Sequence, residues 1–283
     1  IMPSLVGSEM CIRDSLYSLF STIPNLLGPL IAVGIWHVEN MSIFAIVMIF
    51  IAVTTTLFGY RTTFANTQKE VSPKDEVLPF NAMTVYVQFF KNKALFCSGM
   101  IMILSSIVFG AMSTFIPLYT VREGFANAGI FLTIQAITVV IARFYLRKYV
   151  PSDGLWHHRF MMIVLTLLMV ASVIVAFGPH IVSIFVYISA IFIGITQALV
   201  YPTLTTYLSF VLPKIGRNML LGLFIACADL GISLGGVLMG PISDTVGFKW
   251  MYILCALLVT IAMTLSKIRQ RQSVSVSYTH LRA

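Results

Sequence analysis

The feature that most constrains the fold is a series of long apolar runs separated by short polar islands. A helix needs about 20 apolar residues to cross a bilayer, and only 10% of this chain is charged. Helices can satisfy their backbone polar groups within a bilayer, so the runs predict an all-α polytopic membrane protein. We expect eight spans, at about 16–37, 42–60, 95–118, 127–149, 159–178, 181–210, 219–242 and 247–267.

The basic residues predict the orientation of these spans. The net charge of +8 could indicate nucleic acid, but the Lys and Arg side chains lie beside apolar runs, which argues against that partner. They concentrate in alternate connections, whereas the connections on the other side contain only Arg122 and Lys249. Because Lys and Arg favour the cytoplasmic side, we expect the C-terminus and the 61–94 loop to be cytoplasmic.

The two chain ends do not resemble the rest of the sequence. A DNA segment that encodes Gly7–Asp14 has a reverse complement that encodes Val276–Ala283. Folding would not produce such a relation, so we expect 1–15 and 273–283 to be translated sequencing-adapter DNA and exclude them from fold reasoning. The natural protein is then expected to continue beyond at least one end.

The other polar signals are few. The 61–94 segment contains VYVQFFKNK, which predicts either a short helix at the membrane surface or the start of the next span. Cys97, Cys227 and Cys255 lie far apart at or within spans, so they predict neither a disulfide nor a metal site. We find no cofactor motif, no ATP-binding loop and no catalytic constellation, and therefore expect a protein that is not an enzyme.

A weak internal repeat links the first and seventh spans. Leu19 and Phe20 match Leu223 and Phe224, and at the same offset Asn25 matches Asp229. The two segments are six spans apart and enter the membrane from the same side. Six-helix repeats in one orientation are typical of twelve-span transporters.

The native part of the chain resembles the major facilitator superfamily. LLGPLIAVG at 26–34 is similar to the motif of that family's fifth helix, and DLGISLGGVLMGPISDTVGFKWMY at 229–252 to its eleventh helix. ARFYLRKYVPSDG at 142–154 is a degraded form of its basic loop between helices eight and nine. The resemblance implies a major facilitator-type helical bundle, truncated to about eight helices.

This mapping also divides the chain. It implies that 16–60 holds the last two helices of the N-terminal half, 61–94 the central cytoplasmic loop and 95–272 the C-terminal six-helix half. Longer stretches, such as GFANAGIFLTIQAI and YPTLTTYLSFVLP, resemble a bacterial exporter of an opine-type metallophore. Gly28 and Pro29, with Gly231, Gly235, Gly236 and Gly240, form small-residue motifs that predict close helix packing.

Asp229 is the candidate for proton coupling. It lies about ten residues into its span, hence ~15 Å deep, where an ionisable group usually faces a cavity or a partner. It could take up and release a proton, or it could instead make a structural hydrogen bond between the two halves. Asn25, at the equivalent position of the repeat, cannot titrate.

Four further residues are candidates for the substrate path. Arg143, with Gln135 two turns deeper, could bind a carboxylate, although Arg143 could instead extend to the lipid headgroups. Gln197 and Tyr201 lie on one helix face with Thr205, beside Pro202. This stripe predicts either a substrate path or hydrogen bonds between helices.

Together these features predict a secondary transporter that exports a small molecule in exchange for protons. The resemblance implies that the molecule is an opine-type metallophore. Two alternatives remain open at this point: a broad-specificity drug efflux pump of the same superfamily, and a membrane receptor or subunit that does not transport.

Overall fold

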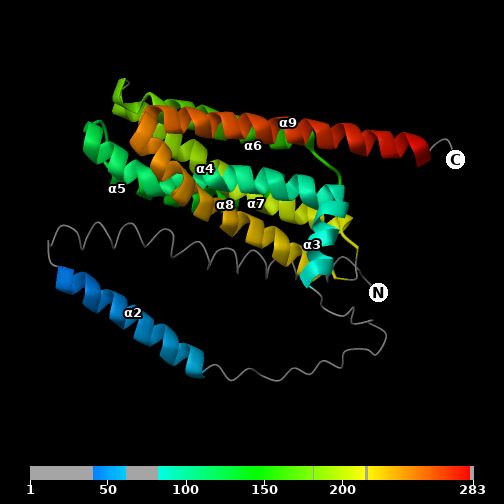
Figure 1. Cartoon of the computed structure of the whole chain (residues 1–283), viewed down its shortest axis with the longest axis horizontal. Coiled ribbons are helices and arrows are strands. Elements are labelled where there is room, and N and C mark those ends of the chain that lie inside the picture. Colours follow the sequence, from blue (N-terminus) through cyan, green and yellow to red (C-terminus); the bar gives the residue numbers. More distant parts are fainter. Residues whose placement is uncertain (1–40, 62–81, 181, 214–215, 281–283) are drawn as a thin grey trace.

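The computed structural model describes residues 41–61, 82–180, 182–213 and 216–280, and every regular element in them is helical (Figure 1). The helices are α2 (Met41–Arg61), α3 (Ala82–Lys91), α4 (Lys93–Glu123), α5 (Ala128–Tyr145), η1 (Arg147–Tyr149), α6 (His158–Ala176), η2 (Gly178–His180), α7 (Ser183–Val211), α8 (Arg217–Val246) and α9 (Phe248–His280). The expected tail at 1–15 and span at 16–37, and the end of the tail at 273–283, lie outside the described residues.

Seven of the described helices are long and apolar enough to cross a membrane. They correspond to the expected spans from 42–60 onwards. α4, α8 and α9 are longer than the sequence predicts, whereas α5 is shorter. The predicted all-α polytopic bundle is therefore confirmed for the described part of the chain. α7 runs without interruption through Pro202.

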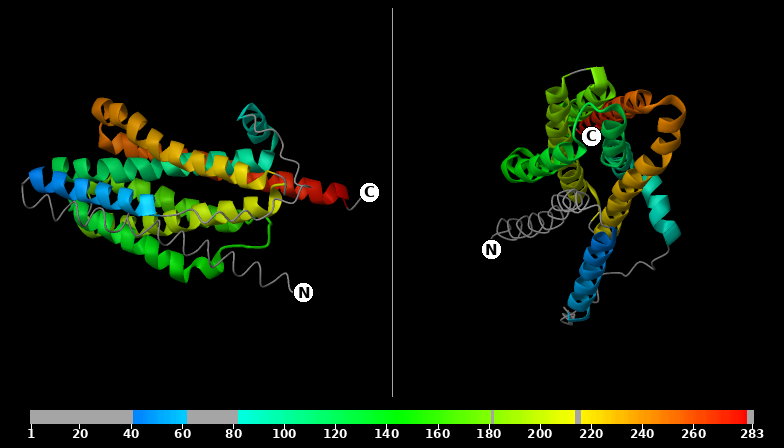
Figure 2. Two further views of the ribbon diagram at one scale, coloured as in Figure 1. Left: turned by 90° about the horizontal axis from the view of Figure 1, so that it is seen from below. Right: turned by 90° about the vertical axis from the view of Figure 1, so that its left-hand side faces the viewer.

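Helices α4 to α9 pack together as one bundle. Most run roughly along its long axis (Figure 1, Figure 2). α4 is the most buried of them and packs against α8 and α9, while α5 packs on α7 and α6 lies between α7 and α9. α2 lies apart from this bundle and is exposed along its length.

Two glycine-dependent contacts bring α4 and α8 together. A Cβ atom at Gly231 would lie 2.6 Å from the carbonyl oxygen of Ile103, and one at Gly235 would overlap the carbonyl oxygen of Ile107. Gly110 of α4 faces the backbone of α8 in the same way. The two backbones are thus too close for any side chain larger than hydrogen at these positions, as in other small-residue helix contacts.

The α3–α4 junction answers one question left open by the sequence. The Asn92 side chain accepts hydrogen bonds from the backbone N–H groups of Ala94 and Leu95, which caps α4 and makes α3 a separate short helix. Phe89 of α3 is buried, and its ring rests on Gly99 of α4. VYVQFFKNK therefore contains a helix of its own that docks on the bundle.

The two ends of the bundle are held by different side-chain clusters. At one end, Trp156 Nε1 donates to the carbonyl of Ser266, and Arg269 donates to the Tyr207 hydroxyl at 2.8 Å. At the other end, Tyr119 packs against Phe248 and donates to the carbonyl of Ala176. These clusters tie α9 to α7 at one end and α4 to α6 at the other.

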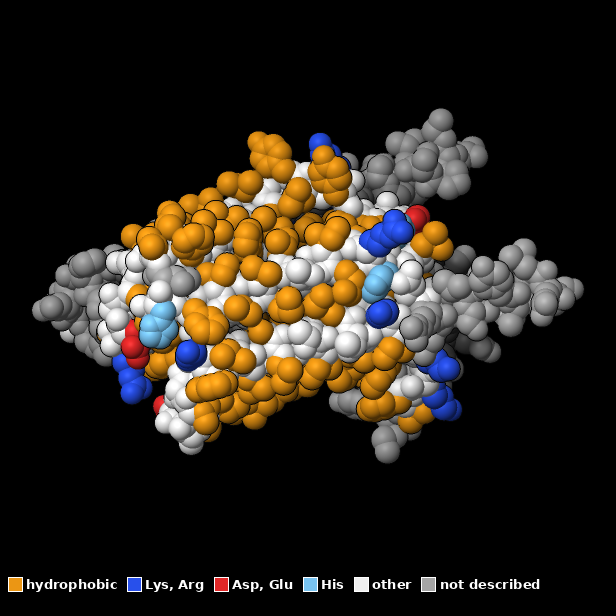
Figure 3. All heavy atoms as spheres, turned by 90° about the horizontal axis from the view of Figure 1, so that it is seen from above, with side chains coloured by type: hydrophobic (Ala, Val, Ile, Leu, Met, Phe, Trp, Pro, Cys, Tyr) orange, Lys and Arg blue, Asp and Glu red, His pale blue; other side chains and the backbone are white. Residues whose placement is uncertain are grey.

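The surface between the two ends is mostly apolar. Figure 3 shows a broad band of hydrophobic side chains, with Lys, Arg and His side chains near the ends of the molecule. This distribution is what a bilayer requires, because the hydrocarbon region is about 30 Å thick and excludes charge.

Candidate functional site

The candidate site lies between α5 and α7, where the two helices approach closely. Gly194 of α7 makes this possible, because a Cβ atom there would lie 2.7 Å from the carbonyl oxygen of Gln135 and 2.8 Å from Thr138 Cβ. Thr196, two residues further, donates to the carbonyl of Val164 and fixes α7 on α6. The position of α7 beside α5 is therefore set by backbone contact.

The structure brings Gln135 and Gln197 together at this contact. Gln135 Nε2 donates to Gln197 Oε1 at 3.1 Å. Gln135 is only 8% exposed, and its own Oε1 is buried without a hydrogen-bond partner among the described residues. The pair therefore retains one buried acceptor on Gln135 and a free amide hydrogen on Gln197.

Arg143 and Tyr201 form a second pair in the same interface. Both side chains are half-buried, and they lie near each other. The Tyr201 ring also packs near Phe224 of α8, with 6.1 Å between ring centroids. All four residues predicted for the substrate path thus lie along one interface.

This arrangement suits an anionic or zwitterionic ligand. Arg143 has five N–H donors in a planar fork and can bind a carboxylate with two hydrogen bonds. The glutamine pair adds a neutral donor and a neutral acceptor. The low polarity around the site strengthens hydrogen bonds and charge interactions with a ligand. A ligand whose polar groups find no partner there is destabilised.

Asp229 does not belong to this cluster. Its side chain is exposed on α8, and its backbone carbonyl accepts a hydrogen bond from Ser233. Whether Asp229 exchanges protons therefore stays a prediction. The matching residue Asn25 lies outside the described residues.

The predicted glycine motif divides into two classes. Gly231 and Gly235 contact the α4 backbone, whereas a Cβ atom at Gly236 or Gly240 would meet only ordinary contacts, at 3.8 Å and 3.6 Å. Gly28 and Pro29 lie outside the described residues.

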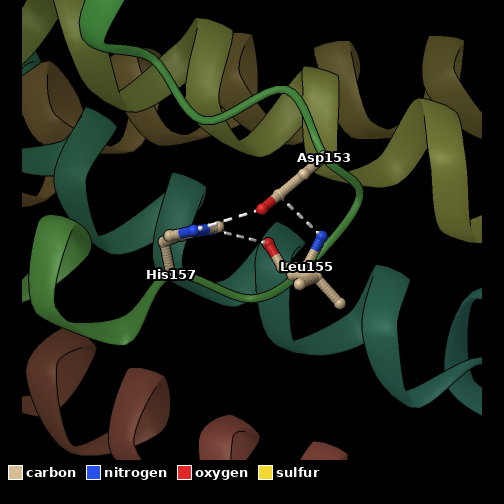
Figure 4. Close-up of polar contacts among 3 residues, drawn as sticks. All are labelled: Asp153, Leu155 and His157. Atoms are coloured by element: carbon tan, nitrogen blue, oxygen red, sulfur yellow. Dashed lines mark hydrogen bonds and ion pairs between the residues drawn. The ribbon is translucent and has the colours of Figure 1, made fainter.

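A loop at the Trp156 end adds one ion pair but no substrate-sized space. His157 Nε2 lies 3.3 Å from Asp153 Oδ2, and Asp153 Oδ1 accepts the N–H of Leu155 (Figure 4). The adjoining cavity, beside Trp156 and Tyr207, has a volume of about 10 Å³. That is room for one water molecule at most.

Sequence reasoning missed Gly194 and Gly110. Neither belongs to a small-xxx-small pair with another glycine. Gly194 is four residues from Ala190 and from Ala198, and Gly110 is four residues from Ser106 and Thr114. Counting Ala, Ser and Thr as small would have found both.

The comparisons with known proteins agree with this architecture. The sequence profile described as Major Facilitator Superfamily matches residues 6–236 and 152–277. The chain is 71% identical over 256 residues to the "Staphylopine export protein" of Staphylococcus aureus (strain Mu50 / ATCC 700699), covering 90% of this chain and 64% of that protein. The chain thus spans less than two thirds of that relative's length.

More distant relatives are of the same type. Uncharacterized MFS-type transporters of Burkholderia mallei (strain SAVP1) and Burkholderia pseudomallei (strain K96243) are each 22% identical over 179 residues, covering 63% of this chain and 43% of each relative. The finer resemblance seen in the sequence, to a metallophore exporter, is confirmed by the match to the staphylopine export protein. With a profile match over most of its length and seven apolar helices among its described residues, the chain is a multi-pass membrane protein and belongs to the Major Facilitator Superfamily.

Proposed function

We propose that this chain is part of a secondary transporter that exports a staphylopine-like metallophore by proton-coupled alternating access. The observation that carries the proposal is the 71% identity to the staphylopine export protein over 90% of the chain. The α5–α7 cluster supports it, because an opine-type metallophore carries carboxylates and Arg143 offers a matching charge. ATP is not part of this mechanism.

In this mechanism α4 to α9 form the C-terminal half, which rocks against an N-terminal half to which α2 belongs. A site between two halves, exposed alternately to each side, is the general mode of such transporters. The proposal is tested with the full-length protein in proteoliposomes, by measuring staphylopine uptake with and without an imposed proton gradient. We expect uptake that stops when the gradient is collapsed.

The same assay separates the two alternatives. A broad drug efflux pump would move apolar cations such as ethidium and would not accumulate staphylopine. A receptor or subunit would bind staphylopine without accumulating it. Either result would overturn the proposed function.

Proton coupling is proposed to reside at Asp229. Changing Asp229 to Asn keeps the size of the side chain but removes its ability to carry a proton, so gradient-driven uptake should fall by at least about tenfold. Exchange of labelled for unlabelled staphylopine without a gradient should continue. The control is Asp244→Asn, which removes another exposed carboxylate from the same helix. Full gradient-driven uptake in Asp229→Asn would make Asp229 a structural residue.

We propose that the protein lies in the bacterial plasma membrane with its C-terminus and central loop in the cytoplasm. The basic residues at the start of α6 and the end of α5 support this orientation. Arg159 and Arg122 are exposed, at the starting end of α6 and the finishing end of α4. A membrane-impermeant maleimide should label Arg122→Cys in intact cells and Arg159→Cys only after permeabilisation. The reverse pattern would invert the topology.

A further inference from the structure

The side-chain oxygen of Gln135 is buried, and the proposed function assigns it no role. Gln135 Oε1 is buried and has no hydrogen-bond partner among the described residues, although Nε2 of the same amide donates to Gln197. A buried acceptor without a donor destabilises the protein, and natural structures contain few of them. Such a group is explained if a ligand supplies the missing donor.

The directions of α5 and α7 and their rise per residue place this oxygen relative to Arg143. α5 and α7 are separated by one helix, so they run in the same direction. Gln197 and Tyr201 are four residues apart on α7, which places them ~6 Å apart along its axis. Gln135 donates a hydrogen bond to Gln197, and Arg143 lies near Tyr201.

Arg143 fits this spacing because helical side chains lean toward the N-terminus of their helix. Its Cα lies two turns further along α5 than that of Gln135, and a guanidinium that leans back toward the N-terminus comes near Tyr201. An acceptor and a cation therefore lie about one helical turn apart, ~6 Å, in one interface. Gln135 is fixed there by the backbone contact at Gly194.

We propose that these four residues form a subsite for an amino-carboxylate group. The ligand donates an amine N–H to Gln135 Oε1, and a carboxylate about one helical turn away binds the Arg143 guanidinium. This inference rests on the proposed function, because it assigns the part of the transported molecule that α5 and α7 recognise. It adds a requirement that a carboxylate site alone does not have: the substrate must carry an N–H donor.

Two small molecules test this requirement directly. L-Glutamate and glutarate have the same two carboxylates and the same carbon chain, and only glutamate has an ammonium group. Binding of each to the full-length protein in nanodiscs is measured by calorimetry. We expect glutamate to bind about tenfold more tightly than glutarate, the difference that one charge-assisted hydrogen bond supplies.

The variants then assign the preference to Gln135. Gln135→Leu should bring the ratio of the two dissociation constants to about one, and this ratio, rather than the affinity for glutarate alone, is the readout. Gln135→Glu keeps an acceptor oxygen at the same reach and should retain the preference for glutamate. The control, Gln88→Leu, makes the same change at an exposed position of α3 and should leave the ratio at its wild-type value.

A wild-type protein without a preference for glutamate, or a Gln135→Leu variant that keeps it, would overturn the subsite. The variants are first compared by size-exclusion chromatography, and Gln135→Glu supplies the test if Gln135→Leu does not fold. Staphylopine uptake is measured separately on the same preparations. If uptake is absent while the ratio still depends on Gln135, the proposed function fails and the subsite stands.

Discussion

Replacing Gly235 with alanine is expected to destabilise the bundle by about 2–3 kcal/mol, the upper part of the range for overpacking a tight interface. The added Cβ atom would overlap the carbonyl oxygen of Ile107 and lie 2.9 Å from the backbone nitrogen of Ala111. Both are main-chain atoms of α4, so no rotamer change relieves the contact and the two helices must separate. The measurement is the melting temperature of the purified protein in detergent, followed by size-exclusion chromatography.

The control is the adjacent glycine. A Cβ atom at Gly236 would meet only Thr114 Oγ1, at 3.8 Å. Alanine favours a helix by about 1 kcal/mol over glycine, so Gly236→Ala should be neutral or slightly stabilising. The two variants differ by one position, and only Gly235→Ala should lower the melting temperature. Equal melting temperatures for Gly235→Ala and Gly236→Ala would show that the α4–α8 contact is looser than the structure has it.

Arg143→Gln is expected to reduce staphylopine uptake by about 100-fold. A half-buried guanidinium bound to a carboxylate contributes roughly 2–5 kcal/mol, because removing it leaves the ligand charge without a partner. Arg143→Lys keeps the charge but loses the two-pronged geometry, so it should fall between the wild type and Arg143→Gln. Uptake is measured over a range of substrate concentrations, to separate an effect on KM from one on protein amount.

Arg147→Gln is the matched control. It removes the same charge one turn further along, at an exposed position in η1, and should leave uptake close to wild type. If Arg143 only extends toward the headgroups, Arg143→Gln and Arg147→Gln will behave alike. That outcome would remove Arg143 from the substrate path and leave the glutamine pair as the remaining candidate.

The sequence allowed the membrane-spanning class to be predicted because bilayer insertion depends on local composition. Each run of about 20 apolar residues is a separate signal that needs no knowledge of its neighbours. The cap at Asn92 is equally local, because a side chain bonds the next turn of its own helix, but the sequence left open whether α3 is a separate helix. Span ends were predicted less well, since α8 extends to Val246 and α9 beyond 267.

The candidate site was predicted only as two separate pairs of residues, one pair on each of two helices. The spacing of Gln197 and Tyr201 placed them on one helix face, and the spacing of Gln135 and Arg143 did the same for another helix. Nothing in the sequence paired Gln135 with Gln197 across 62 residues. That pairing depends on which faces of α5 and α7 meet, and Gly194 decides it through backbone contact.

What the sequence by itself determined is therefore the class of fold, the number of apolar segments in the described region, and which polar residues share a helix face. These properties follow from hydrophobicity and the 3.6-residue period, which act within one helix. Only the tertiary structure decided that Gly231 and Gly235 differ from Gly236 and Gly240, that Gln135 keeps a buried acceptor, and that Asp229 lies apart from it. In a bilayer the lipid-facing and the packed faces of a helix are both largely apolar, so hydrophobicity does little to select the contact face, and close steric fit does.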